Sequence, residues 1–502
     1  MSTQIFLMLV FVFLPPFLYL LLLGQRKKPN HEAAKSRLPP GPRKLPLIGN
    51  LHQLGGMLYR SLQRLSAEYG PLMFLQLGLI PTLIVSSADM AREIFKTHDR
   101  VFSGRPVFYA AKRLSYNLSS VSFAPYGDYW REVRKIVILE LLSAKRVQSF
   151  QSLRDEEVAH MLDSVSLSSG PVNLSELTLS LANNIVCRAA FGKKYDGGGS
   201  DSKSGVYQTL RETQELVGGF YIAEFFPWMG WLNKFNGQEA RVEKNFRQLD
   251  EFYEKVIEEH RSPKPGNDED LVDVLLRLQK DSNQEIPLHI DQIKAVLTDM
   301  FIAGTDTSSA TIVWIMSELI RNPSVMQRVQ VEVRETVKGK QQVEESDLQK
   351  LIYLKSIVKE GFRLHPPVPL LLPRETTESC TIGGFHIPAN TRVFFNAKSI
   401  GEDPKYWKNP KEFRPERFLL DSSVDFKGQH FELLPFGAGR RGCPGIQFAT
   451  QLIELALANL LHRFDWEMAD AVRREELDME EAVGLTMHKK VPLLLMAKPP
   501  TF

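Results

Sequence analysis

The sequence predicts a mainly α-helical domain with small β-sheets, placed behind an N-terminal membrane anchor. Three observations lead to this fold class. Runs with strand character are few and short, and the first two dozen residues form an apolar stretch. Helical spacing of apolar residues dominates the remainder, for example in 152–164, 240–260, 290–321, 345–364 and 445–463.

The N-terminal stretch has the length of a membrane-spanning helix. Every residue between Ile5 and Leu23 is apolar, proline or tyrosine, and a bilayer-spanning helix needs about 20 such residues. A cleaved signal peptide, the alternative, has a basic start and a shorter apolar core of roughly 7–15 residues. Because the start MSTQ contains no Lys or Arg, we expect residues 1–24 to be a transmembrane signal-anchor.

Residues 25–50 are predicted to be a basic and proline-rich hinge. Seven positive charges follow the anchor: Arg26, Lys27, Lys28, Lys35, Arg37, Arg43 and Lys44. By the positive-inside rule they leave the rest of the chain in the cytosol. Four prolines in LPPGPRKLPLIGN favour an extended path.

Residues 51–502 are predicted to form one domain. The chain has 43% apolar and 24% charged residues, a composition typical of a globular protein with a large core. No long linker or internal repeat divides it, since the loose stretches 197–205 and 262–270 are short enough to be surface loops. The strand-like runs lie at 72–87, 381–395 and 491–497.

Charge and cysteine content narrow the function. A net charge of +3 is too small to indicate nucleic-acid binding. The three cysteines, Cys187, Cys380 and Cys443, are widely spaced and odd in number. They match neither a disulfide framework nor a C-x-x-C zinc site, so we expect a reduced, zinc-free protein.

The loop PFGAGRRGCPG, residues 435–445, contains two competing patterns. Gly437, Gly439 and Gly442 match the G-x-G-x-x-G pattern of a dinucleotide-binding turn. Such a turn needs alternating strands and helices around it, with an acidic residue about 20 positions on. Asp465 lies at a tolerable distance, but the residues after Cys443 do not alternate in this way.

The loop is more coherent as a carrier of Cys443. Glycines permit tight turns, and Pro444 suits the first turn of an amphipathic helix over residues 446–464. At a helix N-terminus the dipole and free N–H groups favour the thiolate, which is a ligand for iron. A buried cysteine that only packs is the alternative and the commoner case.

The stretch FGAGRRGCPG resembles the haem-ligand loop of the cytochrome P450 family, F-x-x-G-x-R-x-C. Phe436, Gly439, Arg441 and Cys443 occupy its four fixed places. Three further family motifs occur in the right order, and the similarity to plant microsomal A-type members extends from the anchor almost to the C-terminus. The resemblance implies the cytochrome P450 fold and a haem b whose iron is bound by Cys443.

The second motif is AGTDTS, Ala303 to Ser308, within the apolar-periodic stretch from Asp291 to Arg321. A helix over this stretch would be roughly 45 Å long, and its hydroxyl residues favour a local kink. Alternatively, Thr305 or Asp306 caps a second helix. The resemblance places Thr307 beside dioxygen and makes Asp306 its acid partner, a pair that can relay protons.

Two further motifs concern arginines. Glu360 and Arg363 in EGFR would by themselves be a surface ion pair worth ~0.2–0.5 kcal/mol. The resemblance joins them to Arg417 of PERF in a structural network around the cysteine loop. It also assigns the haem propionates to Trp130 and Arg134 of WREVR, to Arg374 and to Arg441, although a solvated basic face is the alternative for WREVR.

The resemblance implies a monooxygenase that receives electrons from NADPH through NADPH-cytochrome P450 reductase. One atom of dioxygen would enter the substrate and the other would leave as water. A haem protein that binds a ligand without turnover would not need Asp306 and Thr307. A rearranging or dehydrating enzyme would depart from this acid–threonine pattern. The expected location is the endoplasmic reticulum membrane, with a single lipid-embedded span and a cytosolic catalytic domain.

By family analogy a mainly apolar pocket binds the substrate. Its expected residues are Val107, Phe108, Ala303, Val368, Leu370, Leu485 and Thr486. They favour a lipophilic small molecule, such as a terpenoid, alkaloid or phenolic of plant specialised metabolism. For the reductase we expect a basic docking patch made of Arg131, Lys135 and Arg440.

Overall fold

The described part of the chain begins after the predicted anchor. A computed structural model describes residues 37–195, 205–261, 269–281, 287–469 and 473–500. The anchor, 1–24, and the first half of the hinge lie outside these residues. No helix among those described is long and apolar enough to cross a membrane. The last hinge residues join the domain, because Asn50 N donates to Gln76 O at 2.6 Å.

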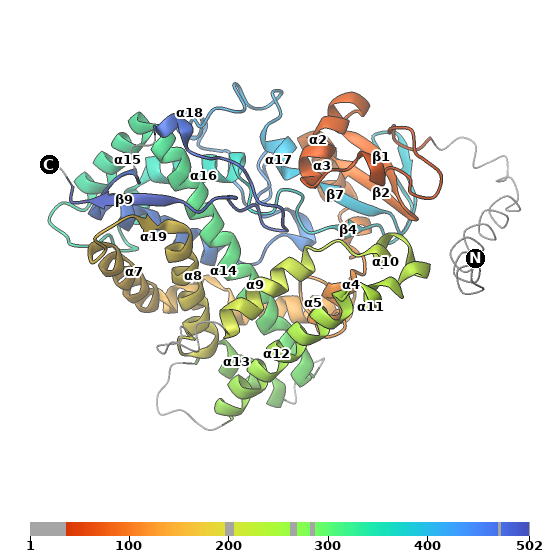
Figure 1. Ribbon diagram of the computed structural model, residues 1–502, viewed down its shortest axis with the longest axis horizontal. Coiled ribbons are helices and arrows are strands. Elements are labelled where there is room, and N and C mark those ends of the chain that lie inside the picture. Colours follow the sequence, from red (N-terminus) through yellow and green to blue (C-terminus); the bar gives the residue numbers. More distant parts are fainter. Residues whose placement is uncertain (1–36, 196–204, 262–268, 282–286, 470–472, 501–502) are drawn as a thin grey trace, which may run out of the picture.

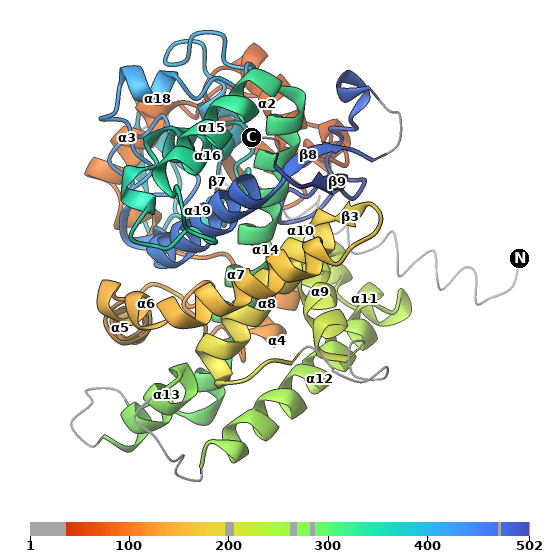
Figure 2. The same cartoon turned by 90° about the vertical axis from the view of Figure 1, so that its left-hand side faces the viewer.

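Helices make up most of the described chain (Figures 1 and 2). The longer helices are α2 (Leu58–Tyr69), α3 (Ala88–Thr97), α5 (Asp128–Ile136), α7 (Gln151–Ser166), α8 (Leu174–Phe191), α9 (Gly205–Val217), α12 (Gln238–Glu259), α13 (Leu271–Lys280), α14 (Ile290–Arg321), α15 (Pro323–Thr336), α16 (Ile352–Leu364) and α19 (Ile446–Arg463). Short helices are α4 (Tyr109–Leu114), α6 (Ala144–Ser149), α10 (Ile222–Phe225), α11 (Leu232–Phe235), α17 (Ala397–Gly401) and α18 (Arg417–Leu420). The five predicted helical stretches are confirmed, except that the stretch 345–364 becomes α-helical only at Ile352.

Three small sheets accompany the helices, as predicted. The largest has the strand order β1 (Leu72–Leu77), β2 (Ile80–Val85), β7 (Arg392–Phe395), β4 (Arg374–Glu375). The others contain β3 (Val172–Asn173), β9 (Leu494–Lys498) and β8 (Asp465–Met468), and β5 (Cys380–Ile382) with β6 (Phe385–Ile387). β1 and β2 are antiparallel, β7 runs parallel to β2, and β4 pairs antiparallel with β7. This pairing sets Arg374 opposite Val393 at the edge of the largest sheet.

The long helix α14 crosses the helical part of the molecule (Figure 1). It is apolar on most sides because it packs against α8, α16 and α19 at the centre of the fold. At 1.5 Å per residue its length is about 48 Å. The alternative in which Thr305 or Asp306 caps a second helix is wrong, because α14 continues through both residues.

Candidate active site

The loop 435–445 carries Cys443 into the interior just before α19. Cys443 N donates to Phe436 O at 2.9 Å, which closes the loop. Gly439 has a φ of 66°, and a Cβ atom there would lie 2.2 Å from Asp99 Oδ1, so only glycine fits. The loop does not follow a strand, so it lacks the strand–turn–helix arrangement of a dinucleotide-binding turn.

The thiol of Cys443 faces an internal cavity. Its surface is exposed to that cavity, while the surrounding protein keeps it from bulk water. Burial raises the pKa of the thiol, whereas the Gly445 amide, which donates to Sγ at 3.3 Å, and the charge of Arg134 act in the opposite direction. In the protein alone, burial therefore raises the pKa of Cys443 by more than the Gly445 amide and Arg134 lower it.

The helix after the cysteine begins at Ile446, as the amphipathic pattern predicts, but it does not include Pro444. Gly445 is the N-cap of α19 and Ile446 its first residue. Pro444 therefore lies before the cap, and its predicted place in the first turn is wrong. The physical reason is that the chain turns at Gly445, whose amide faces the sulfur.

Four arginines line the cavity beside Cys443, of which Arg134 is half-buried and the other three are buried: Arg105, Arg134, Arg374 and Arg441. Backbone carbonyls hold them in place. Arg134 donates to Gly442 O at 2.5 Å, Arg374 to Ala438 O at 2.6 Å, and Arg441 to Ala124 O at 2.7 Å. Arg105 donates to the carbonyls of Leu372 and Pro373 at 2.7 and 2.6 Å.

The positive charge of this cluster is not balanced within the described chain. Only Arg374 of the four has a carboxylate within ion-pair distance, Asp99 Oδ1 at 3.3 Å. Burial lowers the pKa of all four guanidiniums. Repulsion from neighbouring arginines adds to this effect for Arg105, Arg374 and Arg441, and the pKa falls to about 10 for Arg374 and about 9 for Arg441. Buried charges without partners are costly.

A haem fits this set of residues. Its two propionates would supply the negative charge that the arginines lack, in the bidentate geometry that guanidiniums prefer. Its iron would take the sulfur of Cys443 as axial ligand. The ring of Phe436 also lines the cavity and packs edge-on against Phe362, with ring centroids 5.0 Å apart.

Trp130 takes a different place from the one expected for a propionate partner. Its indole N–H donates to Val121 O at 2.9 Å. The Arg441 guanidinium lies over the indole ring, 4.1 Å from the centroid. Trp130 is buried and does not line the cavity, because the Val121 carbonyl occupies its single donor and a cation–π contact occupies its face. The Trp130 ring therefore packs against Arg441 without lining the cavity itself.

Helix α14 places the predicted acid and alcohol side by side. Ala303 and Thr307 line the cavity, and the Thr307 hydroxyl donates to Ala303 O at 2.7 Å. Asp306 is buried and points elsewhere, because successive helical residues are about 100° apart around the axis. Its Oδ1 lies 2.9 Å from Nε2 of His488, whose side chain is 38% exposed.

The predicted arginine network is fully assembled. Arg363 makes two hydrogen bonds with the Glu360 carboxylate, at 2.7 and 2.8 Å, and Arg417 Nε donates to the same carboxylate at 3.0 Å. The side chains of Glu360 and Arg363 are 0% exposed. Arg363 also donates to Gly401 O and Pro410 O, so the network fixes the chain between α17 and α18.

The cavity wall includes four of the seven residues expected to bind substrate. Ala303, Val368, Leu485 and Thr486 line it. Three others do not. Val107 is 57% exposed, Phe108 packs under the guanidinium of Arg392, and Leu370 packs on the core beneath β1.

Family analogy also expects the 102–122 loop to contribute to the pocket, and Val121 and Ser122 of this loop, followed by Phe123, do line the wall. The backbone carbonyls of residues 119–124 accept hydrogen bonds from Tyr129, Trp130, Arg105 and Arg441. The Ser122 amide donates to Asp299 of α14 at 2.9 Å.

Sequence reasoning missed three functional candidates. Arg105 stands in an irregular segment, and nothing in FSGRP indicates that it will meet the cysteine loop. His488 follows Asp306 by more than a third of the chain's length. Asp299 could have been found, since it precedes Ala303 by four residues and therefore shares its helix face.

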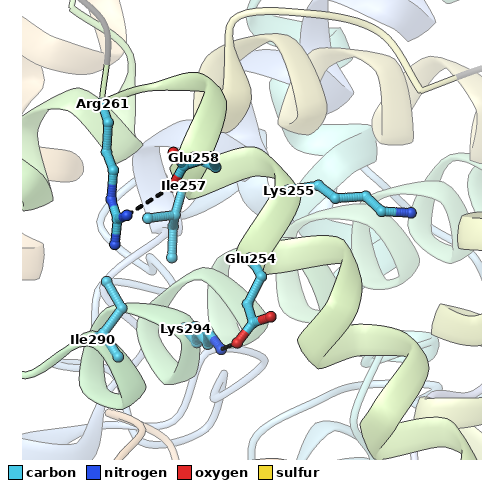
Figure 3. A pocket seen from close by; sticks show the side chains of 7 residues that line it. All are labelled: Glu254, Lys255, Ile257, Glu258, Arg261, Ile290 and Lys294. Carbon is cyan, nitrogen blue, oxygen red and sulfur yellow. Dashed lines mark hydrogen bonds and ion pairs between the residues drawn. The ribbon is translucent and has the colours of Figure 1, made fainter.

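A second depression lies on the surface between the end of α12 and the start of α14 (Figure 3). Four of its five charged groups form ion pairs: Arg261 donates to Glu258 at 2.7 Å, and Lys294 to Glu254 at 3.2 Å. None of the predicted site residues lines it. The internal cavity at Cys443 is therefore the candidate active site.

Comparisons with known proteins agree with this site. The family model for cytochrome P450 matches residues 39–496. The chain is 64% identical to cytochrome P450 71A9 of Glycine max over 98% of both chains, and 56% identical to strychnine-11-hydroxylase of Strychnos nux-vomica over 96% of this chain and 95% of that protein. A zebra fish cytochrome P450 solved with progesterone superposes with a TM-score of 0.76 at 26% identity, covering 88% of this chain and 99% of that structure. The chain belongs to the cytochrome P450 family.

Proposed function

We propose that this cytochrome P450 monooxygenase uses a haem b bound by Cys443 to oxidise a lipophilic small molecule of plant specialised metabolism. The single observation that carries the proposal is the convergence on one cavity of a buried thiol, an uncompensated arginine cluster and the hydroxyl of Thr307. The rest of the wall is mostly apolar and suits an organic substrate.

In this proposal the chain binds the haem at two places, the iron and the two propionates. Cys443 would supply the thiolate ligand of the iron, and Arg105, Arg134, Arg374 and Arg441 would bind the propionates. The haem would supply the activation of dioxygen, of which one atom would enter the substrate while the other would leave as water, with two electrons from NADPH and two protons.

Asp306 and Thr307 supply protons. The Thr307 hydroxyl lies at the cavity wall, where it can donate a proton onward, and Asp306 lies next to it in the helix with its carboxylate on half-exposed His488. This pair favours monooxygenation over a haem protein without turnover and over a rearranging or dehydrating enzyme, which would not need it.

Electrons come from NADPH through NADPH-cytochrome P450 reductase. Residues 1–24 anchor the chain in the endoplasmic reticulum membrane as a single span, with the catalytic domain in the cytosol. The apolar N-terminal sequence and the basic residues that follow it support this arrangement.

The test is the absorption spectrum of the reduced, carbon-monoxide-bound protein. We expect the thiolate-haem band in the unsubstituted chain and in Cys380→Ser, whose cysteine lies on β5, and its loss in Cys443→Ser. A folded Cys443→Ser protein that keeps the band would overturn the ligand assignment. A microsomal screen of terpenoids, alkaloids and phenolics, scored for NADPH-dependent products by mass spectrometry, identifies the substrate.

A further inference from the structure

Asp99 is a buried acid that the proposed reaction does not use. It lies in the turn after α3, and its side chain is 9% exposed. The carboxylate accepts three hydrogen bonds. Its Oδ2 accepts from the amide of Arg440 at 2.9 Å and from Nη1 of Arg440 at 3.0 Å, and its Oδ1 accepts from Nη1 of Arg374 at 3.3 Å. Asp99 therefore joins the cysteine loop to an arginine of the haem cavity.

The position of this carboxylate is fixed from several sides. Gly439 leaves room for it, since a Cβ atom there would lie 2.2 Å from Oδ1. The Ser103 hydroxyl donates to Asp99 O at 2.5 Å and holds the main chain of the turn. Arg374, which binds the carboxylate, also donates to Ala438 O in the cysteine loop at 2.6 Å. The negative charge of Asp99 is thus held in one place relative to the cysteine loop.

The charge of Asp99 acts on the arginines that are assigned to the propionates. In the described chain, Asp99 has the only carboxylate within ion-pair distance of the four cavity arginines. Burial lowers the pKa of Arg374 to about 10 and also lowers the pKa of Arg134, and the charge of Asp99 opposes both shifts. Solvent screens a buried charge less than an exposed one. The field of Asp99 therefore extends to the site where the haem would bind.

We propose that Asp99 is a positioning residue whose fixed negative charge lowers the reduction potential of the bound haem. Reduction adds one electron, which comes from NADPH through the reductase, and a nearby negative charge opposes this addition. Arg440 acts in the opposite direction, because its partly exposed cation pairs with the same carboxylate. A lower potential makes reduction of the substrate-free enzyme less favourable, so that less NADPH is oxidised without product. The inference rests on the proposed function and adds a residue that controls its first electron transfer.

The experiment measures the midpoint potential of the haem-loaded full chain by spectroelectrochemical titration. Asp99→Asn keeps the size of the side chain and removes its charge. We expect the reduced form to be favoured three- to tenfold, a positive shift of about 30–60 mV for a one-electron couple. Asp99→Glu keeps the charge and should change the equilibrium less than twofold. The control Asp128→Asn removes a carboxylate that is 82% exposed and should also change it less than twofold, since solvent screens that charge.

A second pair of variants should shift the potential in the opposite direction. Arg440→Gln removes the cation that partly neutralises Asp99, so the potential should become more negative. Arg131→Gln removes a cation of similar exposure that pairs with Asp128 instead, and it should change the equilibrium less than twofold. A merely structural role of Asp99 would not give shifts of opposite sign in Asp99→Asn and Arg440→Gln.

The two proposals fail in different ways. Absence of the thiolate band in the unsubstituted chain would sink the proposed function. A normal band with the same potential in Asp99→Asn and the unsubstituted chain sinks only the inference on Asp99, as does a shift in Asp99→Glu as large as that in Asp99→Asn. Should Asp99→Asn not incorporate haem, the comparison of Arg440→Gln with Arg131→Gln decides the question alone, and equal potentials of these two variants overturn the inference.

Discussion

Two residues one step apart on α14, Asp306 and Thr307, face different surroundings. Thr307 meets the cavity, whereas Asp306 lies in the protein and ends on the half-exposed imidazole of His488. A hydroxyl at the cavity wall and an acid linked to the surface are the two ends that a proton path requires.

We predict that Thr307→Ala retains the haem spectrum but consumes NADPH without matching product, and that the oxygen leaves as hydrogen peroxide. The reason is that the cavity wall then lacks the Thr307 hydroxyl that passes protons on, so proton delivery no longer keeps pace with electron transfer. The measurement is the ratio of product to NADPH, together with peroxide release. Thr311→Ala is the matched control: this hydroxyl also bonds the carbonyl four residues earlier, but no acid precedes it. Full coupling in Thr307→Ala would contradict the role of this residue.

Single functional residues can be identified from the sequence where they belong to a short motif with fixed spacing. Cys443, Glu360 and Thr307 each belong to a short motif, so their roles could be predicted. Arg105 and His488 could not, because their contacts depend on loops whose path follows from tertiary packing. Trp130 was found by its motif, yet its single N–H takes a carbonyl, which only the folded loop reveals.

Among the elements, the short helix α10 shows how a single buried charge affects stability. Glu224 lies on it and accepts a hydrogen bond from Tyr109 N at 2.9 Å. Burial raises the pKa of Glu224 to about 7, although this hydrogen bond and the charge of Arg392 act against the shift. The folded state therefore binds a proton more tightly than the unfolded chain does.

We predict that Glu224→Gln makes the protein less sensitive to alkaline pH. A raised carboxyl pKa contributes stability that is complete below about pH 4 and is lost as the pH rises through about 7. Glutamine keeps the acceptor for Tyr109 N and is never charged, so the variant should gain on the order of 1–2 kcal/mol relative to the unsubstituted protein between pH 5 and pH 8. Thermal unfolding followed by circular dichroism at both pH values measures this.

The control for this prediction is Glu258→Gln, an exposed glutamate paired with Arg261 at 2.7 Å. It should leave the pH dependence as it is, since surface ion pairs contribute little. An equal pH dependence in Glu224→Gln and the unsubstituted chain would show that the carboxyl group is charged at both pH values.

Element boundaries and very short strands are the parts of the fold that sequence patterns predict least well. Four of the five named helical stretches match the observed helices to within two residues at each end, because their apolar periodicity extends over many turns, whereas α16 begins seven residues after its predicted start. The strands β3 and β4 contain two residues each, too few for any alternation to be read. They exist because distant segments pair with them, as β9 does with β3.

At the scale of the whole molecule, the surface feature that concerns the reductase is the predicted basic docking patch. Arg131, Lys135 and Arg440 are 58, 59 and 49% exposed, as a docking patch requires. Each also pairs with a carboxylate: Arg131 with Asp128, Lys135 with Glu132, and Arg440 with Asp99. The patch is therefore less positive than its arginines and lysine alone suggest.

We predict that Arg131→Glu combined with Lys135→Glu slows reduction of the haem by NADPH-cytochrome P450 reductase, more at low salt than at high salt. Steering by charge is screened over about 8 Å at physiological ionic strength. Stopped-flow reduction under carbon monoxide gives the rate. Lys255→Glu with Arg261→Glu, on the surface of Figure 3, is the control with the same change of charge. Equal rates for the two double variants at low salt would place docking elsewhere.

The fold class followed from the sequence because helical periodicity and a few short strands suffice to define it, and the P450 motifs give its centre. The arrangement of the cavity wall did not follow, since it comes from segments far apart in the chain. Val107 and Leu370 were expected at the wall, whereas the residues of these two regions that line it include Leu114, Phe123, Leu371 and Leu372.

The loop of residues 119–124 is fixed mainly by its main chain and by two serine hydroxyls, those of Ser120 and Ser122, which also bond to Asp299. Carbonyls of Val121, Ser122 and Ala124, together with the Ser122 amide, make the main-chain contacts with the arginine cluster and α14. Substitution of the side chains at 121 and 123 leaves the main-chain bonds in place while it reshapes the wall that meets the substrate. An enzyme built in this way can change its substrate at these two positions without changing the carbonyl contacts that hold Arg105 and Arg441.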